Sequence, residues 1–499
     1  MSTQAPHTLQ KLAIQSLLRD EALAMEAVEH LPGELFPPVF IEAFTRGYTE
    51  VLKAMVLAWP FPCLPLGSLI RTMSLETLDT HLDVALMLKR MFPALLDGLH
   101  QLLSQKVCSR RLKLQVLDMR DVHQHFWRVW AENKSEACSS EAMKRRHTEK
   151  TGPRIATRQP LRVILDLWIS EDPLGPPPHQ PFLLKWVQER KGSVQLDCTK
   201  LWITSTCFPK IMSVLEMLNL DSVQQVDVGH YWTLSTLAHF APYLGQMQNL
   251  HRLTLSNIPV PASLSAEKRD QLVTQITSQF LKLHCLREFY MESVFFLDGH
   301  MDQVLRCLKC PLEKLSLIHS PFSHSDWDQL PHSPSIRHLK HLEMYGISLT
   351  SFNFHPLCFL LDNTAATLTT LHLQACGITD AQLLAFLPAL SHCSQLTTFS
   401  CMRNPISVDT LESLLCHMAW LSNLRMEMYS APQEAYVPRN AVHQLTLDQH
   451  RDELRRIMRP LNHPRIVWFC IAPVVSGGLC SSWGVSSLHS APCYCCIPV

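Results

Sequence analysis

The sequence predicts an α/β solenoid of leucine-rich repeats, a horseshoe with parallel strands on the concave face and helices outside, preceded by a helical region. One stretch matches the consensus pattern of such a repeat closely. From Leu368 to Leu396 it reads LTTLHLQACGITDAQLLAFLPALSHCSQL, which follows the pattern L-x-x-L-x-L-x-x-N/C-x-L. The same triplet of apolar positions then recurs along the chain, starting at Val223, Leu250, Leu286, Leu312, Leu339, Leu368 and Leu396. The steps are 27, 36, 26, 27, 29 and 28 residues, and the longest contains the surface insertion PASLSAEKRDQ. A further unit begins at Leu421 or Leu424.

The spacing of residues within one repeat predicts a strand in its first half and a helix in its second half. Leu371 and Leu373 alternate with polar residues, which puts them on one face of a short strand. Thr379 and Gln382 have the spacing of a helix capping box, and leucines after them form an apolar stripe. Pro388 is expected to bend or shorten that helix. A single unit cannot bury its leucines alone, so neighbours must stack on both sides.

Four segments are expected. Residues 1–130 form a helical N-terminal region, in which one helix over residues 10–30 ends at Pro32 and Gly33, and another from Leu75 to Leu103 is broken at Pro93. Residues 131–160 are polar and read as an exposed loop. Its Lys144, Arg145 and Arg146 fit either a solvated basic loop or part of a nuclear-import signal. Residues 161–460 form the solenoid, opened by the strand-like LRVILDLWI and followed by a second strand, LDCTKLWI. Residues 461–499 form a C-terminal cap and a cysteine-containing tail.

Composition restricts the class of protein. The chain has 499 residues, 46% of them apolar, with 44 basic and 44 acidic side chains and a formal net charge of zero. Such a balance argues against bulk electrostatic binding to nucleic acid or to an anionic membrane. Neither a signal peptide nor a run of eighteen apolar residues is present, so a cytoplasmic or nuclear protein with reduced cysteines is expected.

The outward-facing strand residues are the expected binding surface. They are mixed in charge, include two tyrosines and have few large apolar groups, which favours one protein partner over nucleic acid. This candidate surface comprises Glu288, Tyr290, Glu292, Lys314, His341, Glu343, Tyr345, Thr370, His372, Gln374 and Thr398, with Arg252, Thr254 and Met402 at equivalent positions. The Asn/Cys position of the repeat is filled only by Cys376 and Asn404, so the other repeat loops must satisfy their backbone groups differently.

Several stretches together resemble the PRAME family (preferentially expressed antigen in melanoma) of leucine-rich-repeat proteins. They are SLLRDEALAMEAVEHLPGELFPPVFIEAF, LRVILDLW, LAHFAPYLGQMQNLHRLTLS, TSQFLKLHCLREFYMESVFFLDGHMDQVLR, ACGITDAQLLAFLPALSHCSQLTTFS and LESLLCHMAWLSNL. The resemblance covers most of residues 10–470. It implies a substrate receptor of a cullin-2 RING ubiquitin ligase recruited through elongins B and C. It also implies negative regulation of transcription, apoptosis and differentiation, and positive regulation of proliferation.

The resemblance directs attention to two short motifs. An elongin-binding box has the form small-Leu-x-x-x-Cys-x-x-x-aliphatic, and Ser16, Leu17 and Met25 have its spacing, with Glu21 at the cysteine position and Ala22 beside it. A cullin-contacting box downstream fits Leu31, Pro32, Leu35 and Val39. The set Phe36, Pro37, Phe40 and Phe44 fits it equally well. For both boxes the alternative is that the apolar residues pack against neighbouring helices.

No enzyme signature is found. The chain lacks G-x-x-x-x-G-K-[ST], G-x-G-x-x-G, H-E-x-x-H and G-x-S-x-G, and its fifteen glycines do not cluster. The pair His338 and His341 is expected at the surface, and Cys307 and Cys310 in a turn. Cys480, Cys493, Cys495 and Cys496 depart from the family's C-terminal CPxCG-type ending, so a zinc site there is less expected than a frayed tail. No cofactor is predicted.

Three hypotheses remain: a ubiquitin-ligase substrate adaptor, a ligase-independent corepressor scaffold that binds a nuclear receptor or other transcription factor, and an enzyme with a site on the concave face.

Overall fold

The protein is described from a computed structural model, which covers residues 9–70, 81–105, 112–120, 159–172, 175–229, 232–437, 441–458, 466–470 and 496–498. The chain forms two compact units, residues 1–223 and residues 224–499, and each is considered by itself. Within these residues, no helix is both long enough and apolar enough to span a lipid bilayer. The predicted loop at 131–158, with its basic residues Lys144, Arg145 and Arg146, lies outside the described residues, as do Cys480, Cys493 and Cys495.

The first unit begins with two short helices, not one. Helix α1 (Leu9–Leu18) ends before Asp20, which adopts extended backbone angles (φ −111°, ψ 99°), and α2 (Glu21–Ala27) starts after it. The Asp20 carboxylate accepts a hydrogen bond from the backbone N–H of Leu23 at 3.1 Å and so acts as the N-cap of α2. The expectation of one helix through residues 10–30 is therefore wrong, because an aspartate can stabilise a new helix start in the middle of an apolar pattern.

The helices that follow bury an aromatic core. A 3-10 turn η1 (Gly33–Leu35) leads into α3 (Phe36–Arg46) and α4 (Thr49–Leu57). Trp59 lies edge-on to Phe36 and Phe40, with ring centroids 5.4 and 5.1 Å apart. Helix α6 (His81–Ser104) continues through Pro93, so the break expected there is absent.

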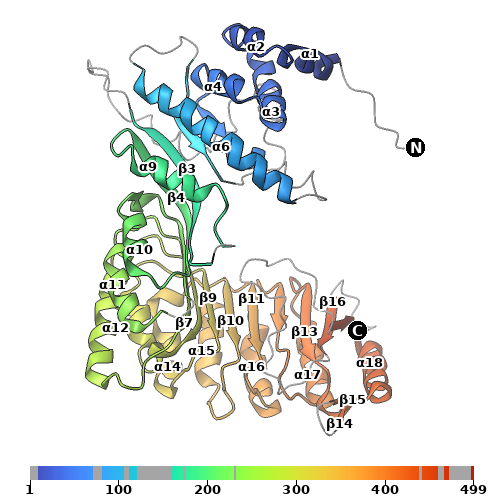
Figure 1. Ribbon diagram of the computed structural model, residues 1–499. Helices are drawn as coiled ribbons and strands as arrows, with labels where there is room; N and C mark the ends of the chain where they lie inside the picture. Colours follow the sequence, from blue (N-terminus) through green and yellow to red (C-terminus); the bar gives the residue numbers. More distant parts are fainter. Residues whose placement is uncertain are drawn as a thin grey trace. The chain divides into compact units, whose positions relative to one another are not determined.

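The sheet of the first unit is parallel throughout its described pairs. Its strands are β1 (Cys63–Pro65), β2 (Val116–Asp118), β3 (Leu161–Ile169) and β4 (Val194–Ile203) in that order, and β5 (Leu218–Asn219) pairs with β4. Both strands that the sequence predicts here, LRVILDLWI and LDCTKLWI, are confirmed as β3 and β4. Helix α9 (Gln180–Gln188) packs beside β4, and its Trp186 indole N–H donates to the Leu96 carbonyl of α6 at 3.0 Å (Figure 1). Helix α10 (Phe208–Leu215) and the 3-10 turn η2 (Leu220–Ser222) complete this unit.

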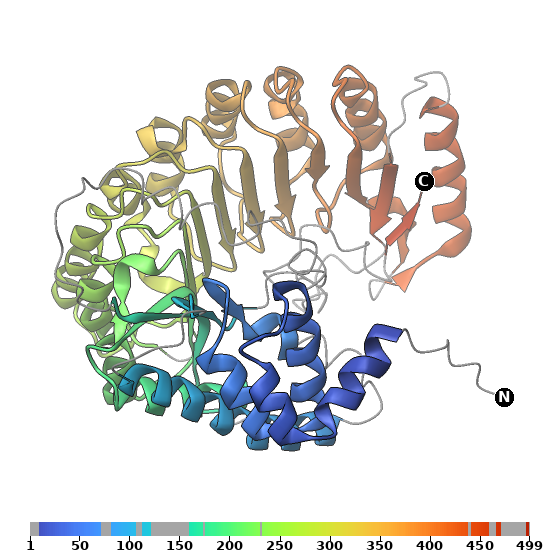
Figure 2. The same ribbon diagram turned by 90° about the horizontal axis from the view of Figure 1, so that it is seen from above.

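The second unit is the repeat array, and it confirms the predicted solenoid of parallel strands and helices. Its strands, joined in sequence order, line the inner side of a curve whose outer side carries the helices (Figure 2). The strands are β6 (Gln225–Gly229), β7 (Arg252–Ile258), β8 (Glu288–Val294), β9 (Lys314–Ile318), β10 (His341–Tyr345), β11 (Thr370–Gln374), β12 (Thr398–Ser400), β13 (Met426–Ser430), β16 (Ile466–Cys470) and β17 (Cys496–Pro498). The helices are α11 (Leu234–Leu244), α12 (Ala266–Phe280), α13 (Met301–Cys307), α14 (His324–Gln329), α15 (His355–Thr364), α16 (Asp380–Ser391), α17 (Val408–Met418) and α18 (Gln444–Met458). The 3-10 turns are η3 (Phe295–Leu297), η4 (Leu330–His332), η5 (Pro334–Ile336) and η6 (Gln433–Ala435), and a small antiparallel pair joins β14 (Tyr436–Val437) to β15 (Ala441–Val442).

The repeats of β7 to β12 turn at one equivalent position, at or close to the end of the strand. The turning residues adopt left-handed backbone angles, at Asn257, Ser293, His319, Gly346, Ala375 and Arg403. Five of the six are not glycine, which is uncommon for this conformation. Gly346 is required for a second reason, because a Cβ atom there would lie 2.3 Å from the imidazole of His319 in the preceding repeat. The shared turn keeps successive strands in register.

The apolar side chains of the strands fill the space between strands and helices. At the equivalent core position six residues are at most 1% exposed: Leu253, Phe289, Leu315, Leu342, Leu371 and Phe399. The predicted capping box of Thr379 and Gln382 is present at the start of α16. That helix contains Pro388 and runs three residues past it, so the proline does not end it there.

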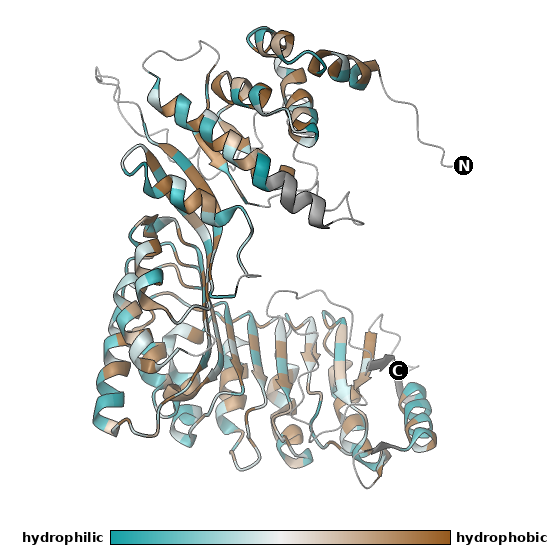
Figure 3. Cartoon of the chain, viewed as in Figure 1, coloured by the Kyte–Doolittle hydropathy of each residue, from teal (hydrophilic) through white to brown (hydrophobic). Residues whose placement is uncertain are grey.

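The last repeat departs from the pattern. Thr398 pairs with Met426, so the further unit starts at Leu424 and not at Leu421. Glu427 occupies the position that leucine or phenylalanine holds elsewhere; it is fully buried and accepts a hydrogen bond from the Tyr429 hydroxyl. After it β16 adds in parallel and β17 in antiparallel orientation, and α18, largely hydrophilic in Figure 3, buries Leu447 and Leu454.

Candidate functional site

The eleven residues predicted for the concave surface all lie on one face of the second unit's sheet. Strand pairing places them in three rows that cross β8 to β12 in register. The first row holds Glu288, Lys314, His341, Thr370 and Thr398; the middle row Tyr290, Glu343 and His372; and the third Glu292, Tyr345 and Gln374. Arg252 and Thr254 of β7 extend the first two rows. The concave face named below is this set of rows.

Tyr290 is the centre of the polar half of the concave face. Its ring lies between two cations: the Arg252 guanidinium carbon is 4.2 Å and the Lys314 Nζ atom 4.8 Å from the ring centroid. Its hydroxyl donates to Glu288 Oε2 at 3.0 Å. Burial, followed by the neighbouring Glu288, raises the pKa of this phenol, and burial lowers the pKa of the Lys314 ammonium. Arg252 and Lys314 therefore both contact the ring of Tyr290, a residue of the same sheet.

Further along the rows, hydrogen bonds join adjacent strands. The Ser316 hydroxyl donates to Glu343 Oε2 at 3.0 Å, and the Gln374 amide donates to the Ser400 hydroxyl at 2.9 Å. Arg403 donates to the Tyr345 hydroxyl at 2.9 Å. These bonds fix the side chains in place, so the concave face is a preorganised surface.

Two histidines on this face keep an unsatisfied ring nitrogen. His372 is 8% exposed, and burial lowers the pKa of its imidazole to about 4, with Lys314 and His341 acting in the same direction against Glu343. Burial likewise lowers the pKa of His341. Nε2 of His372 and Nδ1 of His341 are buried and have no hydrogen-bond partner among the described residues. Both rings are therefore neutral at pH 7.

Sequence reasoning missed part of this face. Asp227 of β6 lies opposite Thr254, and Ser316 and Ser400 complete the middle row. Beyond them Met402, Met428 and Cys470 form an apolar cluster with Met426 and Trp468. Counting one position on from the core residues Val226, Leu315 and Phe399 would have found Asp227, Ser316 and Ser400. Met402 was at a predicted position, but the other members of this cluster were missed because Glu427 breaks the leucine pattern of its repeat.

Repeat loops are satisfied by residues of the following repeat. Asn404 is fully buried; its Oδ1 accepts from the backbone N–H groups of Cys376 and Ile378 at 3.0 Å each, and its Nδ2 donates to the Leu373 and Cys401 carbonyls at 2.7 and 2.8 Å. In an earlier loop, the Ser320 hydroxyl accepts a hydrogen bond from the backbone N–H of Val294 at 3.2 Å. A polar side chain from the next repeat therefore replaces the missing asparagine in at least one loop.

The elongin-box residues do not share one helix. Ser16 and Leu17 lie near the end of α1, while Ala22 and Met25 lie on α2, beyond the break at Asp20. Ser16 and Ala22 are exposed and Leu17 is half-buried. What is exposed is a group of large apolar side chains on the two helices: Leu9 (87%), Leu12 (48%), Leu23 (53%) and Met25 (39%).

The cullin-box residues are divided between surface and core. Leu31 and Val39 are 8% and 1% exposed, Leu35 is half-buried, and Pro32 is exposed. The second set that fits the pattern, Phe36, Pro37, Phe40 and Phe44, is buried as a whole. Packing against neighbouring helices therefore explains all of the second set and half of the first.

Other motifs from the sequence have structural places. His338 is exposed in a turn and His341 is on β10, so the two do not form a pair of ligands. Cys307 ends α13, and the Cys310 thiol contacts the His284 carbonyl, which is turn packing. Among the described residues, no group of three or more His, Cys, Asp or Glu side chains is placed to hold a metal ion.

Comparison with known proteins also divides the chain in two, but between residues 127 and 161 and not at residue 223. The family model of the PRAME N-terminal domain matches residues 5–127 and that of the PRAME C-terminal domain matches residues 161–496. The chain is 46% identical to PRAME family member 12 of Homo sapiens over 496 residues, which is 99% of each chain. It is 46% identical to PRAME family member 20 of Homo sapiens over 470 residues, 94% of this chain and 95% of that one. It is 42% identical to PRAME family member 8 of Homo sapiens over 495 residues, 99% of this chain and 100% of that one.

Proposed function

This chain belongs to the PRAME family, and from that premise we propose that it is a substrate-recognition adaptor of a cullin-2 RING E3 ubiquitin ligase. The N-terminal helices bind elongins B and C and cullin-2, and the concave face binds a protein destined for proteasomal degradation. Ubiquitin transfer belongs to the partner subunits, and this chain contributes proximity. Removal of a regulatory protein in the cytoplasm or nucleus would account for the transcriptional, apoptotic and proliferative roles that the family resemblance implies.

The observation that carries the proposal is the exposed apolar surface of α1 and α2. Leu9, Leu12, Leu23 and Met25 are each 39% to 87% exposed within a segment of 17 residues. Large exposed apolar side chains concentrated in one short segment are candidates for a protein-binding site. Met25 belongs to the predicted elongin box, and Leu12 lies one turn before its Ser16.

The concave face supports the second half of the proposal. It joins tyrosines, cations and carboxylates in a hydrogen-bonded array. Tyrosine and arginine are the residue types that dominate protein–protein binding energy.

Affinity purification of the full-length tagged chain from cells tests the ligase part. The wild type should recover elongin C, and Leu12→Asp and Met25→Asp should reduce that recovery about tenfold or more, because a buried charge in an apolar interface is costly. Gln10→Asp, on an exposed position of the same helix, is the matched control and should change nothing. Recovery of no elongin C by the wild type would refute the ligase part.

A separate pair of variants tests the concave face. Glu292→Arg and Glu343→Arg reverse charges inside the rows, whereas Glu267→Arg reverses one on the outer helix α12. Proximity labelling should show proteins lost with the first two variants and kept with the third, with elongin C recovery equal in all three. If all three variants label the same proteins, the concave face does not bind the target.

The second candidate is a ligase-independent corepressor scaffold that binds a nuclear receptor or other transcription factor. The break between α1 and α2 favours it, because an elongin box is a single helix and here the capped Asp20 interrupts it. A transcription reporter separates the two functions. Repression that survives Leu12→Asp and fails with Glu343→Arg would favour the scaffold over the ligase adaptor.

A further inference from the structure

The face of the first unit's sheet opposite the buried residues of β3 carries a second set of polar and aromatic side chains. Along β3, the odd-numbered residues are buried against the helices, and Arg162, Ile164, Asp166 and Trp168 alternate with them on the other face. None of these residues belongs to the concave rows or to the N-terminal helices α1 and α2, so neither part of the proposed function uses them.

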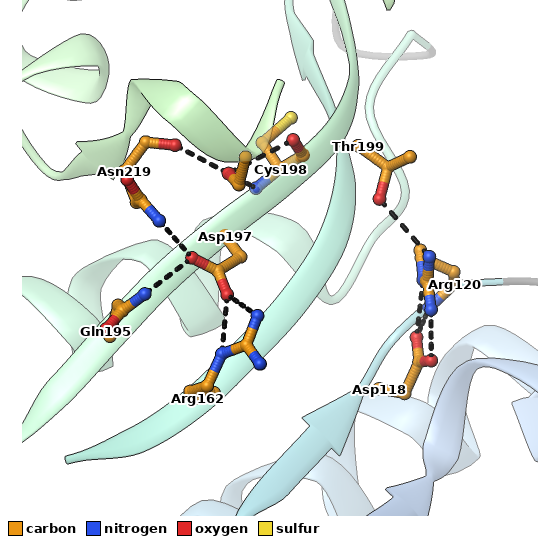
Figure 4. A network of polar contacts seen from close by, with 9 residues as sticks. Asp118, Arg120, Arg162, Gln195, Asp197, Cys198, Thr199 and Asn219 are labelled. Atoms are coloured by element: carbon orange, nitrogen blue, oxygen red, sulfur yellow. Dashed lines mark hydrogen bonds and ion pairs between the residues drawn. The ribbon is translucent and has the colours of Figure 1, made fainter. Parts of the chain in front are cut away.

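Two ion pairs make the face rigid. Asp197 of β4 is 2% exposed, and its carboxylate accepts two hydrogen bonds from Arg162, one from Gln195 at 2.9 Å and one from Asn219 at 2.9 Å (Figure 4). Arg120 is paired in the same way. Its Nε and Nη2 atoms donate to the two oxygens of Asp118 at 3.0 and 2.7 Å, and its Nη1 donates to Thr199 at 3.3 Å (Figure 4). Both guanidinium groups are therefore engaged within the sheet.

Asp166 is the exception between these pairs. Its Oδ1 atom is buried and has no hydrogen-bond partner among the described residues, while the Lys200 backbone N–H donates to the carboxylate. The pairing of β3 with β4 shifts by one residue here, from Leu165 opposite Cys198 to Leu167 opposite Leu201. Such a bulge redirects a side chain at a sheet face. Burial raises the pKa of Asp166 against the opposing effect of Lys200 and Arg120, as expected of a carboxylate that lacks a donor.

Two tryptophans lie directly beside this carboxylate on the same face. Trp168 follows Asp166 by two residues, about 7 Å along the strand. It lies opposite Trp202, with ring centroids 4.8 Å apart and an interplanar angle of 35°. Gln180 of α9 holds the Trp168 backbone by donating to its carbonyl at 2.7 Å and accepting from its N–H at 3.1 Å. Trp168 nevertheless keeps 37% of its surface exposed.

We propose that Asp166 and Trp168 form a docking site for an arginine side chain presented by a partner protein. A guanidinium stacks on an indole and donates to a carboxylate at the same time, which matches the exposed Trp168 indole and the partly exposed Asp166 carboxylate. Arg120 and Arg162 cannot fill this role, because they are forked onto Asp118 and Asp197. Lys200 lies close enough for its charge to act on the Asp166 carboxylate, but it has no planar guanidinium to stack on the indole. Lysine fits less well, because its point charge gains less from the indole face.

The test uses the full-length chain labelled with 5-fluorotryptophan and observed by fluorine NMR. Trp168→Phe and Trp202→Phe assign the two resonances. Three glycine–serine peptides serve as probes, identical except for a central arginine, citrulline or lysine. The arginine peptide should shift the Trp168 resonance saturably, and the citrulline peptide, which keeps the shape without the charge, should not.

Asp166→Asn should weaken binding of the arginine peptide about fivefold or more, because it removes the charge and keeps the size. Glu216→Gln, an equal change at an exposed site of the same unit, should leave binding within about twofold. Unchanged resonances of the other tryptophans show that each variant is folded. Equal binding of the citrulline peptide, preference for lysine, no effect of Asp166→Asn, or no binding up to peptide solubility would each overturn the proposal.

Discussion

The repeat strands were assigned to partner binding from their spacing, and the N-terminal helices from a family resemblance combined with spacing. The two sets of residues lie in different arrangements in the structure. The eleven strand residues fall in three rows on one face. The eight box residues are divided between two helices, a turn and the core, with Val39 1% exposed and Ser16 on the surface. A spacing that recurs in seven repeats predicts the structure well, because every strand must pair in register with its neighbours. A spacing that occurs once has no such constraint, so residues that simply pack in the core can match it equally well.

The largest expected effect comes from the repeat array. Asn404→Ala leaves two buried N–H groups and two buried carbonyls without their partner, and it should lower the free energy of unfolding by about 4 kcal/mol. Asn423→Ala is the matched control; its exposed side chain bonds one carbonyl, and a change within about 0.5 kcal/mol is expected. Chemical denaturation of both variants measures the difference. Equal losses would show that the buried asparagine does not hold the repeats together.

Buried histidines give each unit an acid sensitivity of its own. His372 in the second unit and His179 in the first have pKa values lowered to about 4 by burial, while the unfolded groups titrate near 6.5. The unfolded chain binds the extra proton, so stability is full above about pH 6.5 and falls as pH drops toward 4, by about 3 kcal/mol for each group.

His372→Gln should therefore flatten the pH dependence of unfolding of the second unit, and His179→Gln that of the first. Urea denaturation between pH 7 and pH 4, followed by unit-specific hydrogen exchange, measures both. His30→Gln, at an exposed position, is the control. A slope that stays unchanged in the His372 variant would mean that this imidazole is protonated in the folded state.

The cullin-box assignment can be separated from packing by a pair of substitutions. Val39→Ala opens a cavity in the helical core and should cost about 2 kcal/mol, whereas Leu12→Ala on the exposed face should cost less than about 0.5 kcal/mol. Thermal unfolding checks both. If Val39→Ala left stability unchanged while reducing cullin-2 recovery, Val39 would contact the partner and not the core.

The smallest expected effect concerns the break between α1 and α2. Asp20→Ala removes the hydrogen bond to the Leu23 N–H and should cost about 1 kcal/mol, with faster hydrogen exchange at that amide. Asp20→Asn keeps an acceptor and should cost less. An elongin C affinity that rises with Asp20→Ala would indicate that the two helices merge into one box helix on binding.

The sequence by itself determined the solenoid and the rows of the concave face. The periodicity of Leu250, Leu312, Leu339 and Leu368 predicts parallel strands in register, and a strand's two-residue alternation then fixes which side chains face outward. It also predicted the capping box at Thr379 and the two strands that became β3 and β4.

Only the tertiary structure decided which of the outward groups are satisfied and which apolar groups are buried. Asp20 caps a helix that the apolar pattern did not predict, and α6 continues through Pro93. Glu427 is buried where a leucine was expected, beside a tyrosine hydroxyl two residues on. His372 and Asp166 keep an unpartnered atom because of side chains on neighbouring strands, which no local pattern encodes. Periodicity is a property of consecutive residues, whereas burial and hydrogen-bond satisfaction depend on contacts between residues far apart in the chain.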